Sequence, residues 1–282
     1  MTATRESLAL GTQAAPARTE PARGVDLSIV IPAFNEEHRL PASLGAVSAY
    51  LAARPSAPRV EVLVVDDGSS DATASRAEDA GRRHGLDLRV LRLPRNRGKG
   101  FAVRTGCLEA AGRLVLVSDA DFSTPIYEWE KLASANAPVA IGSRAVDESL
   151  VKEHQSLGRV AMGKLFNRLV RLLLVPGIHD TQCGFKLFSR DAAREIFSRA
   201  TVDRFAYDVE ALLLARELGY AIAEVPVLWF NSPDSRVTLY GGAQAYLELF
   251  RLRMRQRARG PETAGRKPSR AETPPSAPGP SP

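Results

Sequence analysis

Two carboxylates follow an apolar stretch at a spacing that could place both on one side of a strand. The stretch is LVLVSDADFSTP, residues 114–125, and the acids are Asp119 and Asp121. Side chains two residues apart in an extended chain point the same way, so the two anions repel unless a cation or solvent separates them. Mg²⁺ commonly binds one or two carboxylates together with substrate phosphates. The pair therefore predicts a site for Mg²⁺ or Mn²⁺. The alternative is a solvated turn with helix-capping acids.

A second acidic pair, Asp66 and Asp67, follows the apolar stretch VEVLVV and precedes Gly68. A carboxylate at such a position can accept the imide N–H of uracil or a ribose hydroxyl, and glycine lets the backbone come close to a ligand. A capped helix start would use the same residues. The motif alone leaves the two interpretations open.

A basic, glycine-containing turn, PRNRGKG at residues 94–100, precedes a predicted helix. Its cations are Arg95, Arg97 and Lys99, and the N-terminus of the following helix adds to the attraction for an anion. The spacing differs from that of a Walker A motif. We interpret the turn as a phosphate-binding loop, with a solvated basic loop as the alternative.

The elements that must position these residues alternate between strands and helices. We expect strands at 27–34, 60–67, 88–93, 113–119 and 138–143, and helices at 36–53, 69–85 and 99–111. This alternation predicts parallel βαβ units in a doubly wound α/β sheet, and ligands of such sheets bind outside the carboxyl ends of the strands. The motifs PAFNE, DDGSS and DADFS all follow predicted strands, so we expect them to meet in one crevice.

The second half of the sequence is less regular. We expect a basic amphipathic segment at 158–174, a loop to 185, a short strand at 186–188, helices at 191–198 and 208–218, a strand at 221–230 and a last helix at 239–259. The ends, 1–25 and 260–282, have few large apolar residues and are expected to be disordered. One folded domain should therefore occupy residues 26–259.

Composition limits the classes of partner. The chain of 282 residues has a formal net charge of +6, which favours anionic partners such as phosphates, nucleotides or an acidic membrane surface. Its 2 cysteines are too few for a disulfide framework or a thiolate metal site. Nucleic-acid binding is not expected, because the basic segments lack interleaved aromatic residues or a known motif. The oligomeric state does not follow from the sequence.

Several motifs together resemble a known family. LSIVIPAFNEE, VVDDGSSDAT, RNRGKG, VSDADFSTP and IGSRA resemble family 2 glycosyltransferases of the GT-A fold, and DTQCGFKLF and FAYDVEAL resemble the dolichyl-phosphate β-glucosyltransferases among them. The resemblance covers about 27–229. It implies a GT-A, Rossmann-like, mostly parallel sheet flanked by helices, with a donor half at about 26–145 and an acceptor half at about 146–259.

The resemblance also implies roles for individual residues on the donor side. The nucleoside-binding loop would contain Pro32, Ala33, Asn35 and Glu36. Base and ribose would bind Asp66 and Asp67, and Lys99 would lie near the phosphates. Asp119 and Asp121 match the motif that holds the metal and the diphosphate.

The catalytic residues implied by the resemblance are Asp121, Arg144, Asp180 and Gln182. Arg144 resembles an arginine that contacts phosphate, with a surface salt bridge as the alternative. Asp180 and Gln182 resemble acceptor-side residues. We interpret Cys183 as a packed small residue, because this chemistry needs no thiol.

The function implied is inverting transfer of a hexose, with glucose from UDP-glucose expected, to a polyprenyl phosphate of the dolichyl type. The lipid phosphate is already anionic near neutral pH, so Asp180 would position a substrate rather than take a proton. One alternative is the same donor chemistry with a soluble or saccharide acceptor. Others are a nucleotidyltransferase and an inactive nucleotide-sugar-binding or membrane scaffold protein.

Membrane attachment is predicted from two segments, because no apolar run approaches the roughly 20 residues that span a bilayer. In residues 159–172 and 247–257 apolar side chains alternate with Lys or Arg, a pattern that suits an anionic membrane surface. A helix packed on the sheet with a solvated basic face would have the same pattern. We expect a cytoplasmic protein peripherally associated with the cytoplasmic face of a membrane.

Overall fold

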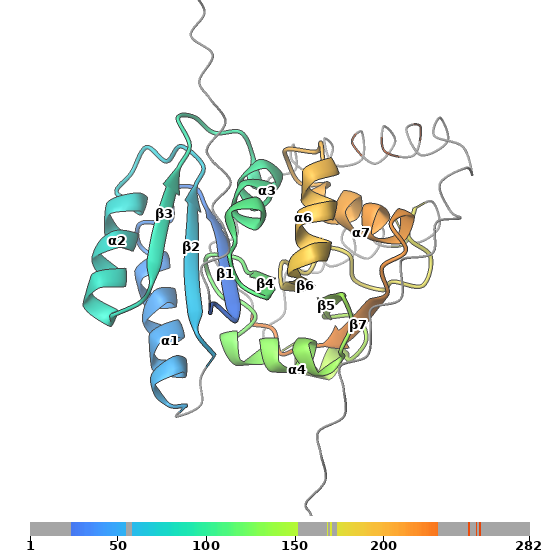
Figure 1. Cartoon of the computed structure of the whole chain (residues 1–282), viewed down its shortest axis with the longest axis horizontal. Coiled ribbons are helices and arrows are strands. Elements are labelled where there is room, and N and C mark those ends of the chain that lie inside the picture. Colours follow the sequence, from blue (N-terminus) through green and yellow to red (C-terminus); the bar gives the residue numbers. More distant parts are fainter. Residues whose placement is uncertain are drawn as a thin grey trace, which may run out of the picture.

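A computed structural model of the chain describes residues 24–54, 58–151, 168, 170, 174–230, 248, 252 and 254. The described strands form one seven-stranded sheet in the order β3-β2-β1-β4-β6-β5-β7 (Figure 1). Their bounds are β1 Leu27–Ala33, β2 Val60–Asp66, β3 Leu88–Arg92, β4 Leu114–Val117, β5 Val139–Ser143, β6 Lys186–Ser189 and β7 Ile222–Pro226. The expectation of a mostly parallel α/β sheet flanked by helices is confirmed.

The sheet contains one antiparallel insertion. Strands β1 to β4 pair in parallel, as do β5 and β7, whereas β6 runs antiparallel to β4 and to β5. Val117 at the carboxyl end of β4 pairs with Lys186, the first residue of β6. The loop before β6 therefore reaches the sheet edge where the loop after β4 begins, and strands of both predicted halves share one sheet.

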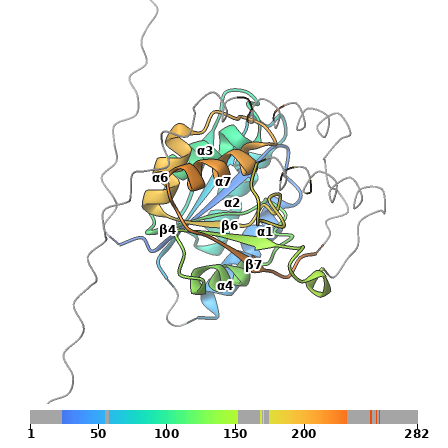
Figure 2. The same ribbon diagram turned by 90° about the vertical axis from the view of Figure 1, so that its right-hand side faces the viewer.

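Helices cover both faces of the sheet (Figures 1 and 2). On one face lie α1 (Leu40–Ala52), α2 (Thr73–His84) and α4 (Trp129–Ser134), which a short 3₁₀ helix, Ile126–Glu128, precedes. On the other lie α3 (Lys99–Glu109), α6 (Arg190–Arg199) and α7 (Tyr207–Glu217). A second 3₁₀ helix, Glu148–Leu150, follows β5. Successive side chains of β1 pack into opposite cores. Ile29 and Ile31 pack with the first set of helices, and Val30 packs with the second.

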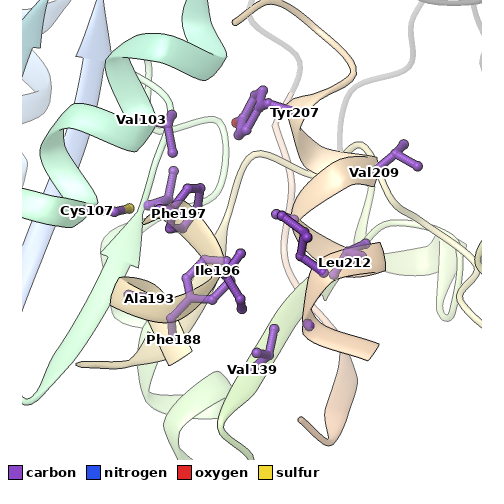
Figure 3. Close-up of a cluster of buried hydrophobic side chains, with 14 of the residues drawn as sticks. Val103, Cys107, Val139, Phe188, Ala193, Ile196, Phe197, Tyr207, Val209 and Leu212 are labelled. Carbon is purple, nitrogen blue, oxygen red and sulfur yellow. The ribbon is translucent and has the colours of Figure 1, made fainter. Parts of the chain in front are cut away.

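The larger core packs α6 and α7 of the second half against α3 (Figure 3). Phe188 of β6 and Phe197 of α6 meet edge to face with ring centroids 5.4 Å apart, and both are buried. Val103 and Cys107 of α3 belong to the same cluster as Leu212 of α7. These contacts hold α3, which carries Lys99 at its first position, in a fixed relation to β6.

Several predicted element boundaries were wrong. The first helix begins at Leu40 instead of Glu36, because Asn35 has φ 55° and the N–H groups of Arg39 and Leu40 both donate to the Glu36 carbonyl in a turn. Pro41 then occupies the first turn of the helix, where proline is tolerated. The last strand ends at Pro226 and not at residue 230. The 3₁₀ helix at 126–128 and α4 were not predicted.

Nearly all of the predicted disordered ends, and most of both basic segments, lie outside the described residues. Of the few described members, Val170, Leu174 and Leu252 are buried, whereas Met254 is 51% exposed. Within the described part of the chain, no helix is both long enough and apolar enough to cross a membrane.

Candidate active site

The loops that follow β1 and β2 are joined at the carboxyl edge of the sheet. Pro32 and Ala33 belong to β1 itself, where Ala33 pairs with Asp66. The backbone N–H of Asn35 donates to the Ser69 hydroxyl at 2.9 Å, and the Asn35 side-chain oxygen accepts the N–H of Ser70 at 2.9 Å. The PAFNE and DDGSS motifs therefore lie together, as expected for motifs that follow the carboxyl ends of parallel strands.

The two acids of the DDGSS motif have different partners. Both Asp67 oxygens accept backbone N–H groups of the basic loop, from Arg97 and Gly98, each at 2.8 Å. Burial raises the pKa of Asp67, and these two donors offset the shift only in part. Asp66 accepts the N–H of Ser69 at 3.0 Å within its own loop. Asp67 thus holds the basic loop, a use that its sequence position did not indicate.

The basic loop is also held by the loop between α6 and α7. Asp203 forms ion pairs with Arg97 at 3.1 Å and with Arg104 at 2.8 Å, and its carbonyl accepts the N–H of Phe101. Gly98 has φ 107° and lies against the Asp203 backbone, so a side chain there would be strained and would collide. Elements of both predicted halves therefore shape the basic loop.

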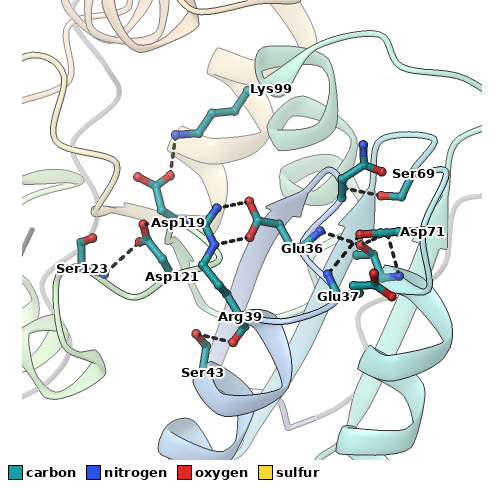
Figure 4. Close-up of polar contacts among 12 residues, drawn as sticks. Glu36, Glu37, Arg39, Ser43, Ser69, Asp71, Lys99, Asp119, Asp121 and Ser123 are labelled. Carbon is teal, nitrogen blue, oxygen red and sulfur yellow. Dashed lines mark hydrogen bonds and ion pairs between the residues drawn. The ribbon is translucent and has the colours of Figure 1, made fainter. Parts of the chain in front are cut away.

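Asp119 is paired with Lys99 (Figure 4). The Lys99 ammonium donates to the Asp119 carboxylate across the carboxyl edge of the sheet. Burial would raise the pKa of Asp119, but Lys99 outweighs it and lowers the pKa. Gly184, in the loop before β6, lies directly behind the carboxylate, and a Cβ at that position would overlap it. The glycine of DTQCGF is therefore needed for the position of Asp119.

Asp121 is held at the same edge by the backbone that follows it. One oxygen accepts the N–H of Ser123 at 3.0 Å, and the other lies 3.9 Å from Nη1 of Arg39. Among the described residues, no group of three or more His, Cys, Asp or Glu could hold a metal ion. Two carboxylate groups nevertheless fit a hard cation that takes its remaining ligands from substrate phosphates.

Arg144 and Asp180 form a fork in which Asp180 is buried and Arg144 is partly buried. Nε and Nη2 of Arg144 donate to the two oxygens of Asp180 at 2.7 and 3.0 Å, and the Arg144 backbone N–H adds a third bond at 3.1 Å. Burial would raise the pKa of Asp180, but the guanidinium outweighs it and lowers the pKa to about 2. The Arg144 guanidinium also lies over the Trp229 ring, 5.5 Å from its centroid. Asp180 is therefore ionised at neutral pH, and a surface salt bridge does not describe Arg144.

The loop around Asp180 is fixed from two directions. The Glu224 carboxylate accepts the N–H of Asp180 at 2.7 Å, and the N–H of Gln182 donates to Asp180 at 3.1 Å. Nε2 of Gln182 is buried and has no hydrogen-bond partner among the described residues. Cys183 is buried, and burial raises the pKa of its thiol, which agrees with a packed residue.

A second buried ion pair lies behind the site, and the sequence did not indicate it. Nζ of Lys186 donates to Asp208 of the FAYDVEAL motif and to the Cys183 carbonyl at 2.6 Å. Both side chains are buried. The pair ties the start of α7 to the DTQCGF loop. A buried lysine in an apolar strand, KLF, was the available signal.

A mostly parallel sheet flanked by helices, with a basic loop and paired acids at its carboxyl edge, matches the architecture of a GT-A glycosyltransferase. The model of the family "Glycosyl transferase family 2" matches residues 28–197. The chain belongs to glycosyl transferase family 2, and this expectation is confirmed.

Two similar curated proteins carry the same name. Dolichyl-phosphate beta-glucosyltransferase of Drosophila melanogaster is 41% identical over 250 residues, which cover 84% of this chain and 77% of the relative. The human protein of the same name is 39% identical over 243 residues, covering 81% of this chain and 75% of the relative.

Solved structures support the fold. Mannosyl-3-phosphoglycerate synthase from Rubrobacter xylanophilus aligns with a TM-score of 0.60 at 20% identity, covering 88% of this chain and 79% of that one. Glucosyl-3-phosphoglycerate synthase from Mycobacterium tuberculosis, in complex with Mn²⁺, UDP and glucosyl-3-phosphoglycerate, aligns with a TM-score of 0.58 at 19% identity, covering 82% and 80%.

Proposed function

We propose that this chain transfers glucose from UDP-glucose to a polyprenyl phosphate with inversion at the anomeric carbon. The observation that carries the proposal is the fork between Arg144 and Asp180 beside the paired acids. It keeps the acidic residue of the acceptor side ionised and engaged, so Asp180 is not placed to act as a general base. An acceptor that is already an anion needs none, and the relatives named above act on dolichyl phosphate.

On the donor side, the loop residues bind and orient the nucleotide. Asp66 and Asn35, which both bond to the serines of the DDGSS loop, would receive the uridine, and Asp67 would hold the basic loop that follows β3. Lys99, within reach of Asp119, would bind the diphosphate once a donor lies between them. Pre-arranged cations of this kind stabilise charge that develops on a leaving group.

The acids of the DAD motif would hold Mg²⁺ or Mn²⁺. Asp119 and Asp121 supply carboxylate oxygens, which suit such cations, and the donor diphosphate would supply further oxygens. When bound, the cation would neutralise the negative charge that accumulates on departing UDP.

The proposed transfer step requires no proton transfer. An oxygen of the lipid phosphate attacks the anomeric carbon, a new carbon–oxygen bond forms, and the bond from that carbon to the UDP oxygen breaks with its electron pair going to UDP. Arg144 would contact the acceptor phosphate with the edge of its guanidinium that does not bond to Asp180. Gln182 would orient the acceptor phosphate. Alignment and charge stabilisation would supply the rate enhancement.

The proposal includes peripheral binding to the cytoplasmic face of a membrane, which a polyprenyl acceptor requires. It is supported by the basic apolar segments of the sequence, whose described members are few.

The experiment is a donor and acceptor panel. Purified protein is incubated with labelled UDP-glucose, GDP-mannose or UDP-N-acetylglucosamine, with Mg²⁺ or Mn²⁺, and with polyprenyl phosphate or a soluble saccharide. We expect label from UDP-glucose to enter the organic phase only with polyprenyl phosphate. Label that remains aqueous and on the saccharide would overturn the proposed acceptor.

A further inference from the structure

Arg39 lies between two motifs of the site and belongs to neither. It is the last residue before α1, and its guanidinium lies between the Glu36 carboxylate and the acids of the DAD motif (Figure 4). We propose that Arg39 is a positioning residue for Asp121, clamped by Glu36, and that it couples the loop after β1 to the metal-binding loop after β4. The inference rests on the metal role proposed above for Asp121.

Glu36 holds Arg39 in one orientation. Nε and Nη2 of Arg39 donate to the two Glu36 oxygens at 2.7 and 2.5 Å. The two side chains are only 22% and 11% exposed. A two-bond fork between planar groups fixes both distance and direction, which a single bond does not. The third nitrogen, Nη1, is thereby directed to one side, and that side faces Asp121.

The clamp has a rigid base. The backbone N–H of Glu36 donates to the Thr73 hydroxyl at 2.7 Å, and the Asp71 carboxylate accepts the N–H of Thr73 at 3.0 Å. These bonds tie the turn at 35–39 to the first residues of α2. Arg39 therefore extends from a fixed support toward the neighbouring loop.

At Asp121 the contact is an ion pair and not a hydrogen bond. Nη1 lies 3.9 Å from Oδ2, while Oδ1 accepts the N–H of Ser123 at 3.0 Å. The backbone bond fixes one oxygen, and the positive charge of Arg39 attracts the other. Together they set the plane of the carboxylate. Lys99, in contrast, hydrogen-bonds directly to Asp119.

This geometry changes the interpretation of Glu36. The resemblance placed it in the nucleoside-binding loop, but both of its oxygens bond to Arg39. Glu36 then acts on the diphosphate end of the site through Arg39. Lysine cannot replace Arg39, because an ammonium lacks the fork that binds Glu36 at two points.

The test measures binding of Mn²⁺ in the presence of UDP, from the electron paramagnetic resonance signal of free Mn²⁺. Groups that orient metal-binding carboxylates typically change metal affinity about 10- to 100-fold when removed, and we expect Arg39→Met to weaken Mn²⁺ binding by that factor. Asp121→Asn should weaken it at least as much. The double variant should be no weaker than Asp121→Asn alone, because Arg39 acts through that residue.

Arg54→Met is the matched control. Arg54 lies just beyond the other end of α1 and forms the same kind of fork with Glu130, through bonds of 2.8 and 3.1 Å, away from the DAD motif. We expect it to leave Mn²⁺ binding with UDP unchanged. Thermal melting of every variant reports its folding. Should Arg39→Met fail to fold, Glu36→Gln replaces it, because that change loosens the clamp and keeps Arg39.

The outcomes separate the inference from the proposed function. Normal Mn²⁺ affinity in Arg39→Met, or in Glu36→Gln if it is needed, together with a defective Asp121→Asn would overturn only the role of Arg39. Effects that multiply in the double variant would do the same. Normal affinity in Asp121→Asn would overturn the proposed metal site and the inference with it.

Discussion

Asp180 combines deep burial with a negative charge that the Arg144 guanidinium neutralises through a two-bond fork. Removing one partner of such a pair leaves the other charged, partly buried and without its hydrogen bonds. The fork therefore has two consequences, one for stability and one for the pH range over which Asp180 stays ionised.

Asp180→Asn should destabilise the protein at pH 7 by about 3 kcal/mol, since breaking a buried pair costs roughly 3–5 kcal/mol and Arg144 keeps some contact with solvent. Urea unfolding at pH 7 measures the loss. A difference below about 0.5 kcal/mol would contradict the account, because surface substitutions fall within that range.

The pH dependence follows from the lowered pKa. The Asp180 pKa falls from 3.8 to about 2 on folding, so ionised Asp180 stabilises the folded state above pH 3.8 and the stabilisation fades as pH falls through about 2. The stability difference between wild type and Asp180→Asn should therefore be constant from pH 7 to about 5 and shrink between pH 4 and 2. Asp180 stays ionised between pH 8 and 5, so its titration should cause no loss of transfer activity in that range.

The arrangement of strands and loops determines which side chains come together at the candidate site. The sequence predicted the first five strands and the convergence of three motifs at their carboxyl ends, because strand alternation and parallel topology are local and general properties. The antiparallel insertion of β6 was not predicted, because strand order depends on pairings between distant residues such as Val117 and Lys186. The same holds for the paired use of Arg39 and for the contact of Gly184 with Asp119. Each needs two segments that only the fold brings together.

A substitution at Gly184 tests how closely the loop before β6 packs against Asp119. Gly184→Ala should lower transfer about a hundredfold, because the added methyl group displaces Asp119 and displacements near 1 Å can cost that much. Gly45→Ala in α1 is the control: its Cβ would press on the His84 ring at 3.3 Å, a tight contact that involves no candidate site residue. We expect the control to retain activity. Full activity in Gly184→Ala would contradict the position assigned to Asp119.

Substitutions of Asp66 and Asp67, the two acids at the end of β2, should have different effects. Asp67→Asn should lower stability by about 1–3 kcal/mol, because its amide group would face one of two backbone N–H donors that now bond to a carboxylate. Asp66→Asn keeps an oxygen for the N–H of Ser69, so it should weaken UDP binding with a smaller change in stability. Unfolding curves and calorimetric titration with UDP measure both. Equal stability of the two variants would count against this division of roles.

Across the whole molecule, strands of both predicted halves share one sheet, so under the proposed function the lipid would have to come to the site. Each basic residue near an anionic surface contributes about 1 kcal/mol, and salt screens that attraction. We expect the full chain to float with anionic vesicles at low salt and to dissociate at high salt, while neutral vesicles bind less. Absence of binding to anionic vesicles at low salt would contradict peripheral attachment and favour a soluble acceptor.

The most direct test of the account is glucosyl transfer by wild type and Asp121→Asn, each with EDTA and with added Mg²⁺ or Mn²⁺. The substitution keeps the shape of the side chain and removes one negative charge, so the departing UDP would lose its counter-charge. We predict that wild type transfers glucose to polyprenyl phosphate only with the cation, and that Asp121→Asn loses most transfer while its melting temperature is unchanged or higher, because like charges no longer repel. Near-normal transfer by Asp121→Asn, or full wild-type activity in EDTA, would contradict the claim that the acids of LVLVSDAD hold a metal against the donor diphosphate.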